Sequence, residues 1–170
     1  VDAQVTGVEL RPDMVALCTR AIAKLQLTGL RIEQGDVRSW TPAALNVMIA
    51  LHACDTATDE ALALAIRLGV PAILSVPCCQ HELAAQLAAA SPPLAPPVPA
   101  LLAHGLLRGA YADLLTDALR VELLDACGYE VAVVEFVGSE HTAKNVLLRA
   151  HRRHAYAPVD RSRWRLAPVA

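Results

Sequence analysis

Two short and mostly apolar runs, residues 45–51 and 70–76, constrain the fold of this chain more than any other feature. Apolar runs of this length are typical of strands buried in a parallel sheet. Residues 56–68 between them predict a helix that ends at Gly69, and Thr56 and Asp59 have the spacing of a capping box. Because such strand–helix–strand units are right-handed, the two strands should lie side by side.

The rest of the chain continues the alternation of strands and helices. Further strands are predicted over residues 5–10, 30–34, 129–137 and 144–150, and further helices over residues 12–28, 81–90 and 101–126. The last two strands are joined by a short loop, which predicts an antiparallel hairpin. The whole pattern indicates an α/β fold, with a mostly parallel, Rossmann-like sheet and helices on both faces.

Composition limits the class of protein. A hydrophobic content of 55% can form the core of one domain, which we expect over residues 1–152, with a basic tail over residues 153–170. That tail could contact phosphate or be a solvated terminus. The odd number of cysteines, five, predicts a reducing, cytoplasmic setting. No apolar run reaches the roughly 20 residues that span a bilayer, so we expect no membrane contact.

Ligands of open α/β sheets bind at the carboxyl ends of the strands, so the residues that follow each strand are the first candidates for a site. Glu9 lies at the end of the first strand and could accept hydrogen bonds from ribose hydroxyls. Asp36 follows the second and could accept one from an adenine amino group. The alternatives are an acid at a helix start for Glu9 and a turn residue for Asp36.

The third and fourth strands are followed by a cluster of residues with acid–base or metal-binding side chains. They are His52, Cys54, Asp55, Cys78, Cys79 and His81. The cluster could be a substrate pocket with a general base, a zinc site, or cysteine packing. The spacing matches no paired CxxC motif, so we predict no metal. We assign catalysis to His52 and Asp55, and the substrate pocket to the other four residues.

The loop of the predicted hairpin, GSEHTAKN, carries two further candidates for the substrate pocket, His141 and Asn145. The hairpin returns this loop to the same side of the sheet, where it could close over the site. A solvated turn is the alternative interpretation.

Several segments together resemble a known family. GVELRPDM, QGDVRSW, HACDTATD, PCCQHEL and VVEFVGSEHTAKN are similar to class I S-adenosylmethionine-dependent methyltransferases found in bacteria, over nearly the whole chain up to Arg152. HACDTATD also resembles a segment of a eukaryotic tRNA 2′-O-methyltransferase. The resemblance implies S-adenosylmethionine as cofactor, with Glu9 at its ribose and Asp36, Val37 and Leu51 beside it. Residues 52–55 would then face the methyl group and its acceptor.

The leading functional hypothesis is a methyltransferase that acts on RNA and contacts it through the basic tail. A methyltransferase for a small metabolite is the alternative, and a methyltransferase-like scaffold without activity is another. A dehydrogenase that uses a nicotinamide cofactor is a weaker option, which the closing hairpin disfavours. The chain also lacks an NPPY-like tetrad after residue 51, which disfavours methylation of an adenine amino group.

The chain begins at Val1 without a methionine, and we expect it to lack the first strand and glycine-rich loop of the methyltransferase fold. The strands beside a missing central strand would have unpaired backbone groups, each costing about 1–3 kcal/mol when buried. We therefore predict that residues 1–170 alone bind S-adenosylmethionine weakly or not at all. Calorimetric titration measures this directly, and a micromolar dissociation constant would contradict the prediction.

Overall fold

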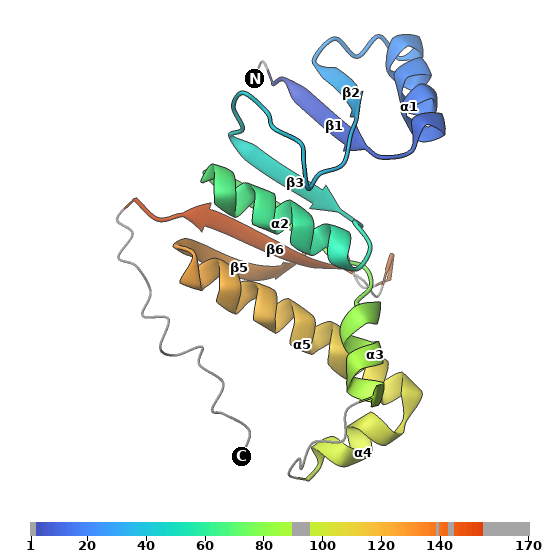
Figure 1. Ribbon diagram of the computed structural model, residues 1–170, viewed down its shortest axis with the longest axis vertical. Coiled ribbons are helices and arrows are strands. Elements are labelled where there is room, and N and C mark those ends of the chain that lie inside the picture. Colours follow the sequence, from blue (N-terminus) through green and yellow to red (C-terminus); the bar gives the residue numbers. More distant parts are fainter. Residues whose placement is uncertain (1–2, 90–95, 139, 143–144, 155–170) are drawn as a thin grey trace. The chain divides into compact units, whose positions relative to one another are not determined.

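The computed structural model describes residues 3–89, 96–138, 140–142 and 145–154 (Figure 1). The chain forms two compact units, Val1–Ala44 and Leu45–Ala170. The predicted tail lies almost wholly outside the described residues, so the expected domain boundary at residue 152 stays a prediction. Among the described residues, no helix combines the length and apolarity needed to cross a bilayer.

The first unit is a pair of parallel strands with one helix. Strand β1 (Val5–Glu9) pairs with β2 (Leu30–Gln34) from Val5 opposite Leu30 to Glu9 opposite Gln34. Helix α1 (Pro12–Lys24) connects them and packs against β2. Pro12 suits the first turn because its missing N–H needs no partner there. The helix ends at Lys24, with Leu25 as its C-cap residue, before the predicted stop at Gly29.

The second unit contains a four-stranded sheet in the order β3-β4-β6-β5. Its strands are β3 (Val47–Leu51), β4 (Ala72–Val76), β5 (Tyr129–Glu135) and β6 (Val146–Arg152). Strands β3 and β4 are parallel neighbours, which confirms the predicted crossover. Strand β6 is antiparallel to both β4 and β5, which confirms the predicted hairpin.

The helices of this unit are α2 (Thr56–Leu68), α3 (His81–Ala89), α4 (Val98–Ala103) and α5 (Gly105–Ala126). The last two replace one predicted helix, because the backbone is extended at His104. Helices α2 and α5 lie side by side over one face of the sheet (Figure 1). Met48 and Ala50 of β3 are buried, whereas Val47, Ile49 and Leu51 are exposed. Burial of β3 on both faces, the sequence prediction, is therefore wrong.

The core of the second unit is closed by Tyr129 at the start of β5. Its side chain is only 1% exposed, and its hydroxyl donates to the carbonyl oxygens of Val70, at 2.9 Å, and Ala65, at 3.4 Å. A buried hydroxyl without such acceptors would be unfavourable. The bonds join β5 to the end of α2 and the start of β4. The largest fully buried aliphatic side chains of the described residues are Leu62, Val70, Ile73, Val76, Leu124 and Leu148.

The buried guanidinium of Arg120 joins α5 to α2. Its side chain is 3% exposed and binds both carboxylate oxygens of Asp59, at 2.7 and 2.9 Å, and Asp117 at 3.0 Å. Burial acts to lower the pKa of Arg120, but the bonds to Asp59 and then Asp117 raise it overall.

The predicted capping box of Thr56 and Asp59 at the start of α2 is wrong. Asp55 is the N-cap residue of α2, without a side-chain cap bond, and Asp59 binds Arg120 instead.

Replacing Arg120 should destabilise the second unit strongly. Arg120→Ala leaves the mostly buried carboxylate of Asp117 without its cation, and such losses cost about 3 kcal/mol or more. Arg67→Ala, on the exposed face of α2, is the matched control and should cost less than about 0.5 kcal/mol. Urea denaturation followed by circular dichroism measures both. Equal stability of the two variants would contradict the role given to Arg120.

Candidate functional site

In the first unit, the two acids predicted to bind cofactor emerge at the same edge of the strand pair. Glu9 is the last residue of β1, and its carbonyl accepts a hydrogen bond from the Gly35 N–H at 3.0 Å, just before Asp36. The Glu9 carboxylate accepts the Arg11 N–H at 2.9 Å at the start of α1. The parallel pairing thus brings Glu9 and Asp36 together, as the sequence predicts.

The Asp36 carboxylate is held as an anion by Arg38. It accepts the Arg38 backbone N–H at 2.9 Å and the guanidinium through further bonds. The side-chain bond to Arg38, followed by the backbone bond, lowers the pKa of Asp36 to about 2. Val37 lies between them and is half-buried. Any contact between Asp36 and an adenine amino group must therefore share the carboxylate with Arg38.

In the second unit, the loops that follow β3 and β4 are hydrogen-bonded to one another. The His52 N–H donates to the Val76 carbonyl at 2.9 Å, and the Asp55 N–H donates to the Cys79 carbonyl at 3.2 Å. His52 and Asp55 have positive φ angles of 51° and 53°. This conformation costs residues other than glycine about 1–3 kcal/mol and concentrates at functional sites.

The loops after β3 and β4 form a rim at the carboxyl ends of these strands. Asp55 of the first loop is bonded to the second loop, to α3 and to α5. Its carboxylate Oδ1 accepts the Glu82 N–H at 3.1 Å in the first turn of α3, and its carbonyl accepts from Arg120 at 3.3 Å. These contacts make Asp55 a positioning residue for the loop. His52 is exposed at the end of β3, beside exposed Leu51. Of the two predicted catalytic residues, His52 is therefore better placed to reach a substrate.

The three cysteines of the rim lie together. The Sγ atoms of Cys54 and Cys78 are 3.6 Å apart, and those of Cys78 and Cys79 are 3.9 Å apart. Burial, together with the neighbouring thiols of Cys54 and Cys79, raises the pKa of Cys78 to about 12. A thiol protonated at neutral pH is a poor nucleophile. Covalent catalysis by Cys78 is accordingly disfavoured.

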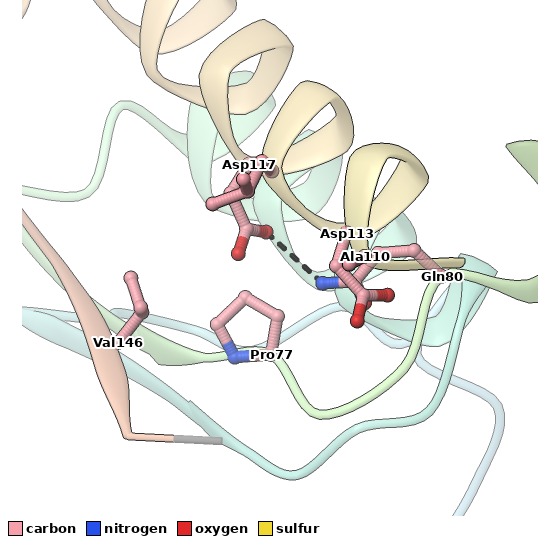
Figure 2. A pocket seen from close by; sticks show the side chains of 7 residues that line it. Pro77, Gln80, Ala110, Asp113, Asp117 and Val146 are labelled. Atoms are coloured by element: carbon pink, nitrogen blue, oxygen red, sulfur yellow. Dashed lines mark hydrogen bonds between the residues drawn. The ribbon is translucent and has the colours of Figure 1, made fainter. Parts of the chain in front are cut away.

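A pocket of about 260 Å³ opens between the loop after β4 and the N-terminal half of α5 (Figure 2). Gln80, 4% exposed, donates to the Asp117 carboxylate at 3.2 Å. Among the described residues, its Oε1 atom is buried without a hydrogen-bond partner. A bound water or a ligand donor would satisfy this atom. The pocket is lined by Pro77, Gln80, Ala110, Asp113, Leu114, Asp117 and Val146.

The pocket residues were not found from the sequence, because α5 reaches the rim only through tertiary packing. Gln80 lies within the PCCQHEL segment, whose resemblance to the methyltransferase family is the sequence signal for this position. Of the other predicted pocket residues, His81 is the exposed first residue of α3. The side chain of His141 is 70% exposed, and its Nε2 atom lies 3.6 Å from Oε1 of Glu140. Asn145 donates to Glu135 at 2.9 Å and to Val137 at 2.7 Å, which closes the β5–β6 turn.

A family described as a methyltransferase domain matches residues 1–86, just over half of the chain, and the chain belongs to this family. None of the curated proteins compared with the chain matches it. The family assignment agrees with the resemblance found in the motifs around Glu9, Asp36 and His52.

A solved methyltransferase structure shares the fold. The SAH-bound Podospora anserina methyltransferase PaMTH1 has 13% identity and a TM-score of 0.53, over 89% of this chain and 62% of its own. A SAM-dependent methyltransferase from Aquifex aeolicus has 16% identity and a TM-score of 0.45, over 87% of this chain and 67% of its own. The present chain therefore spans less than two thirds of the Podospora structure.

The charge state of Asp36 is testable by pH titration. Its lowered pKa means that the contribution of its ionised form to stability is present above the usual value of 3.8 and is lost as the pH falls through about 2. Carbon NMR of the carboxyl group should show the transition near pH 2, and Arg38→Ala should move it towards 3.8. Arg31→Ala is the control, because Arg31 pairs with Glu33. A wild-type transition at 3.8 would contradict this assignment.

Proposed function

We propose that the protein containing this chain transfers a methyl group from S-adenosylmethionine to RNA, and that the pocket at Gln80 receives one nucleobase of that RNA. The family assignment supports methyl transfer, and the SAH-bound Podospora structure supports the cofactor. The observation that carries the choice of acceptor is the pocket with its buried, unpartnered amide oxygen.

The cofactor proposal fits the acids of the first unit. Carboxylates only accept hydrogen bonds when ionised, and the ribose and adenine of S-adenosylmethionine offer hydroxyl and amino donors. Glu9 would hold the ribose hydroxyls, and Asp36 the adenine amino group, both from one edge of the β1–β2 pair. When bound, the cofactor supplies a methyl group already activated on sulfur, so the protein's task is mainly to align the acceptor.

The proposal of a nucleobase rests on the size and the polar groups of the pocket. A volume of about 260 Å³ is below that of most drug-sized sites, and suits a single ring system. The Gln80 amide and the carboxylates of Asp113 and Asp117 are groups that read the hydrogen-bonding edges of bases. Enzymes that modify nucleotides commonly seat one unstacked base in such a pocket.

His52 is the proposed general base. It is exposed and follows β3 directly. The last residue of β3, Leu51, pairs with Val76 of β4, and Pro77, the next residue after Val76, lines the pocket. A neutral imidazole can take a proton from a hydroxyl or amine. Asp55, through its bonds to α3 and Arg120, would hold the loop that presents His52.

The phosphate contacts of RNA are assigned to the tail. Within the described part of the basic stretch, Arg152 donates to the Gly69 carbonyl at 2.9 Å, and Arg153 pairs with Asp125 at 2.5 Å. These two arginines take part in the fold. The RNA role therefore falls on Arg161, Arg163 and Arg165, which lie outside the described residues.

A small metabolite is the second candidate acceptor. The lining of the pocket contains no aromatic side chain, whereas aromatic platforms are common where proteins stack single-stranded bases. This candidate shares the cofactor and the rim with the RNA proposal, so an assay that separates the acceptors must distinguish them.

The test uses full-length protein, methyl-labelled S-adenosylmethionine and total RNA. We expect label in RNA that becomes soluble after ribonuclease treatment. Ala110→Trp fills the pocket and should lower the rate by roughly 100-fold without changing cofactor binding, because a misplaced acceptor is not aligned for transfer. Leu119→Trp, elsewhere on exposed α5 surface, is the matched control and should leave the rate within about twofold.

The outcomes separate the candidates. Label in small molecules of a cell extract but not in RNA would replace RNA with a metabolite. Label in neither, together with intact cofactor binding, would leave the scaffold hypothesis. RNA labelling that Ala110→Trp does not reduce would refute the assignment of the pocket, although RNA would remain the acceptor.

A further inference from the structure

The loops after β3 and β4 present three sulfur atoms at one point. Cys54 comes from the first loop, and Cys78 and Cys79 come from the second. The thiol sulfurs of all three lie within 4.8 Å of one another. Parallel pairing of Leu51 with Val76 and the backbone bond from Asp55 to Cys79 set this arrangement. The sulfurs therefore come together through the regular structure of the sheet.

The separations match those around a thiophilic metal ion. Zinc lies about 2.3 Å from each thiolate, so two sulfurs of a tetrahedral site are about 3.8 Å apart. The observed distances of 3.6 Å for Cys54–Cys78 and 3.9 Å for Cys78–Cys79 bracket this value. They are far longer than the roughly 2.05 Å of a disulfide bond. Two of the three sulfur–sulfur distances thus already fit a zinc site before an ion binds.

Packing alone does not account for the cluster. A structural free cysteine is usually buried, whereas Cys54 is exposed and Cys78 and Cys79 are only half-buried. The cluster is therefore not sealed in the core, and it is open to solvent on the side of Cys54. Among the described residues, no fourth His, Cys, Asp or Glu ligand atom joins the group.

We propose that Cys54, Cys78 and Cys79 bind one Zn²⁺ ion and leave its fourth position open. Ligand type supports this metal, because cysteine sulfur selects zinc and copper(I) over magnesium and calcium, and each thiol, Cys78 included, would release its proton to solvent as the ion binds. Sites with three protein ligands and one exchangeable position are typical of zinc that contacts water or a substrate. The separation of the cysteines along the chain does not fit a paired CxxC motif, and the geometry supplies the evidence that spacing lacks.

The ion would join two loops of the proposed active rim. Cys54 lies between His52 and Asp55 in the chain, and Cys79 precedes Gln80 of the pocket. Zinc would therefore fix the loop that carries His52 against the loop that carries Gln80. The inference does not depend on the methyl acceptor, since metal content is measured without any assay of transfer.

The test measures zinc directly on reduced, full-length protein. After dialysis against a metal-free buffer with a thiol-free reductant, one added Zn²⁺ should be retained by each chain, as measured by elemental analysis. Cys54→Ser, Cys78→Ser and Cys79→Ser should each weaken zinc binding by at least about 100-fold in competition with a chromophoric chelator. Cys18→Ser and Cys127→Ser, outside the cluster, are the matched controls and should bind as the wild type does.

A second measurement needs no variant and so is independent of their folding. Cobalt(II) replaces zinc, and its charge-transfer absorption should show three thiolate ligands. Retention of no zinc by the reduced wild type, or equal losses in the control variants, would overturn the proposal. So would a Cys54–Cys78 disulfide found as the native state together with a reduced form that does not bind zinc.

Discussion

The arrangement of the second unit depends on one buried cation. Arg120 comes from α5, far along the chain from the residues that it binds, and it holds Asp59 of α2 and the Asp55 carbonyl at the same time. A guanidinium without partners would not be tolerated at this depth. Its partners are consequently fixed in position, and through Asp117 the same network reaches Gln80. The packing of α5 against α2 and the position of Gln80 in the candidate pocket thus depend on the same buried guanidinium.

Much of the fold could be predicted from the sequence because hydrophobic pattern and turn residues act locally. The positions of β3, α2 and β4 follow from two apolar runs and from Gly69, whose φ of 61° closes α2. The β5–β6 hairpin follows from its short loop. The break at His104 and the exposure of Val47, Ile49 and Leu51 could not be predicted, because both depend on which elements pack together rather than on local preference.

The candidate site divides in the same way. Glu9, Asp36 and His52 lie at or just after the ends of strands, so their positions could be derived from the order of elements. Asp117 gives no such signal, because it lies in the middle of a helix and becomes part of the rim only when α5 packs against the loop after β4. Asp55 was expected to act on substrate, and its contacts with Glu82 and Arg120 show how far it is engaged in holding the loops.

The position of β6 has a consequence for biosynthesis. This strand is the last element of the described chain, yet it lies between β4 and β5 and is hydrogen-bonded to both. Until the ribosome has released residue 152, β4 and β5 have no neighbour to join them. The sheet must therefore close after translation of this region rather than strand by strand, and the nascent chain exposes two unpaired edges of the kind that chaperones recognise.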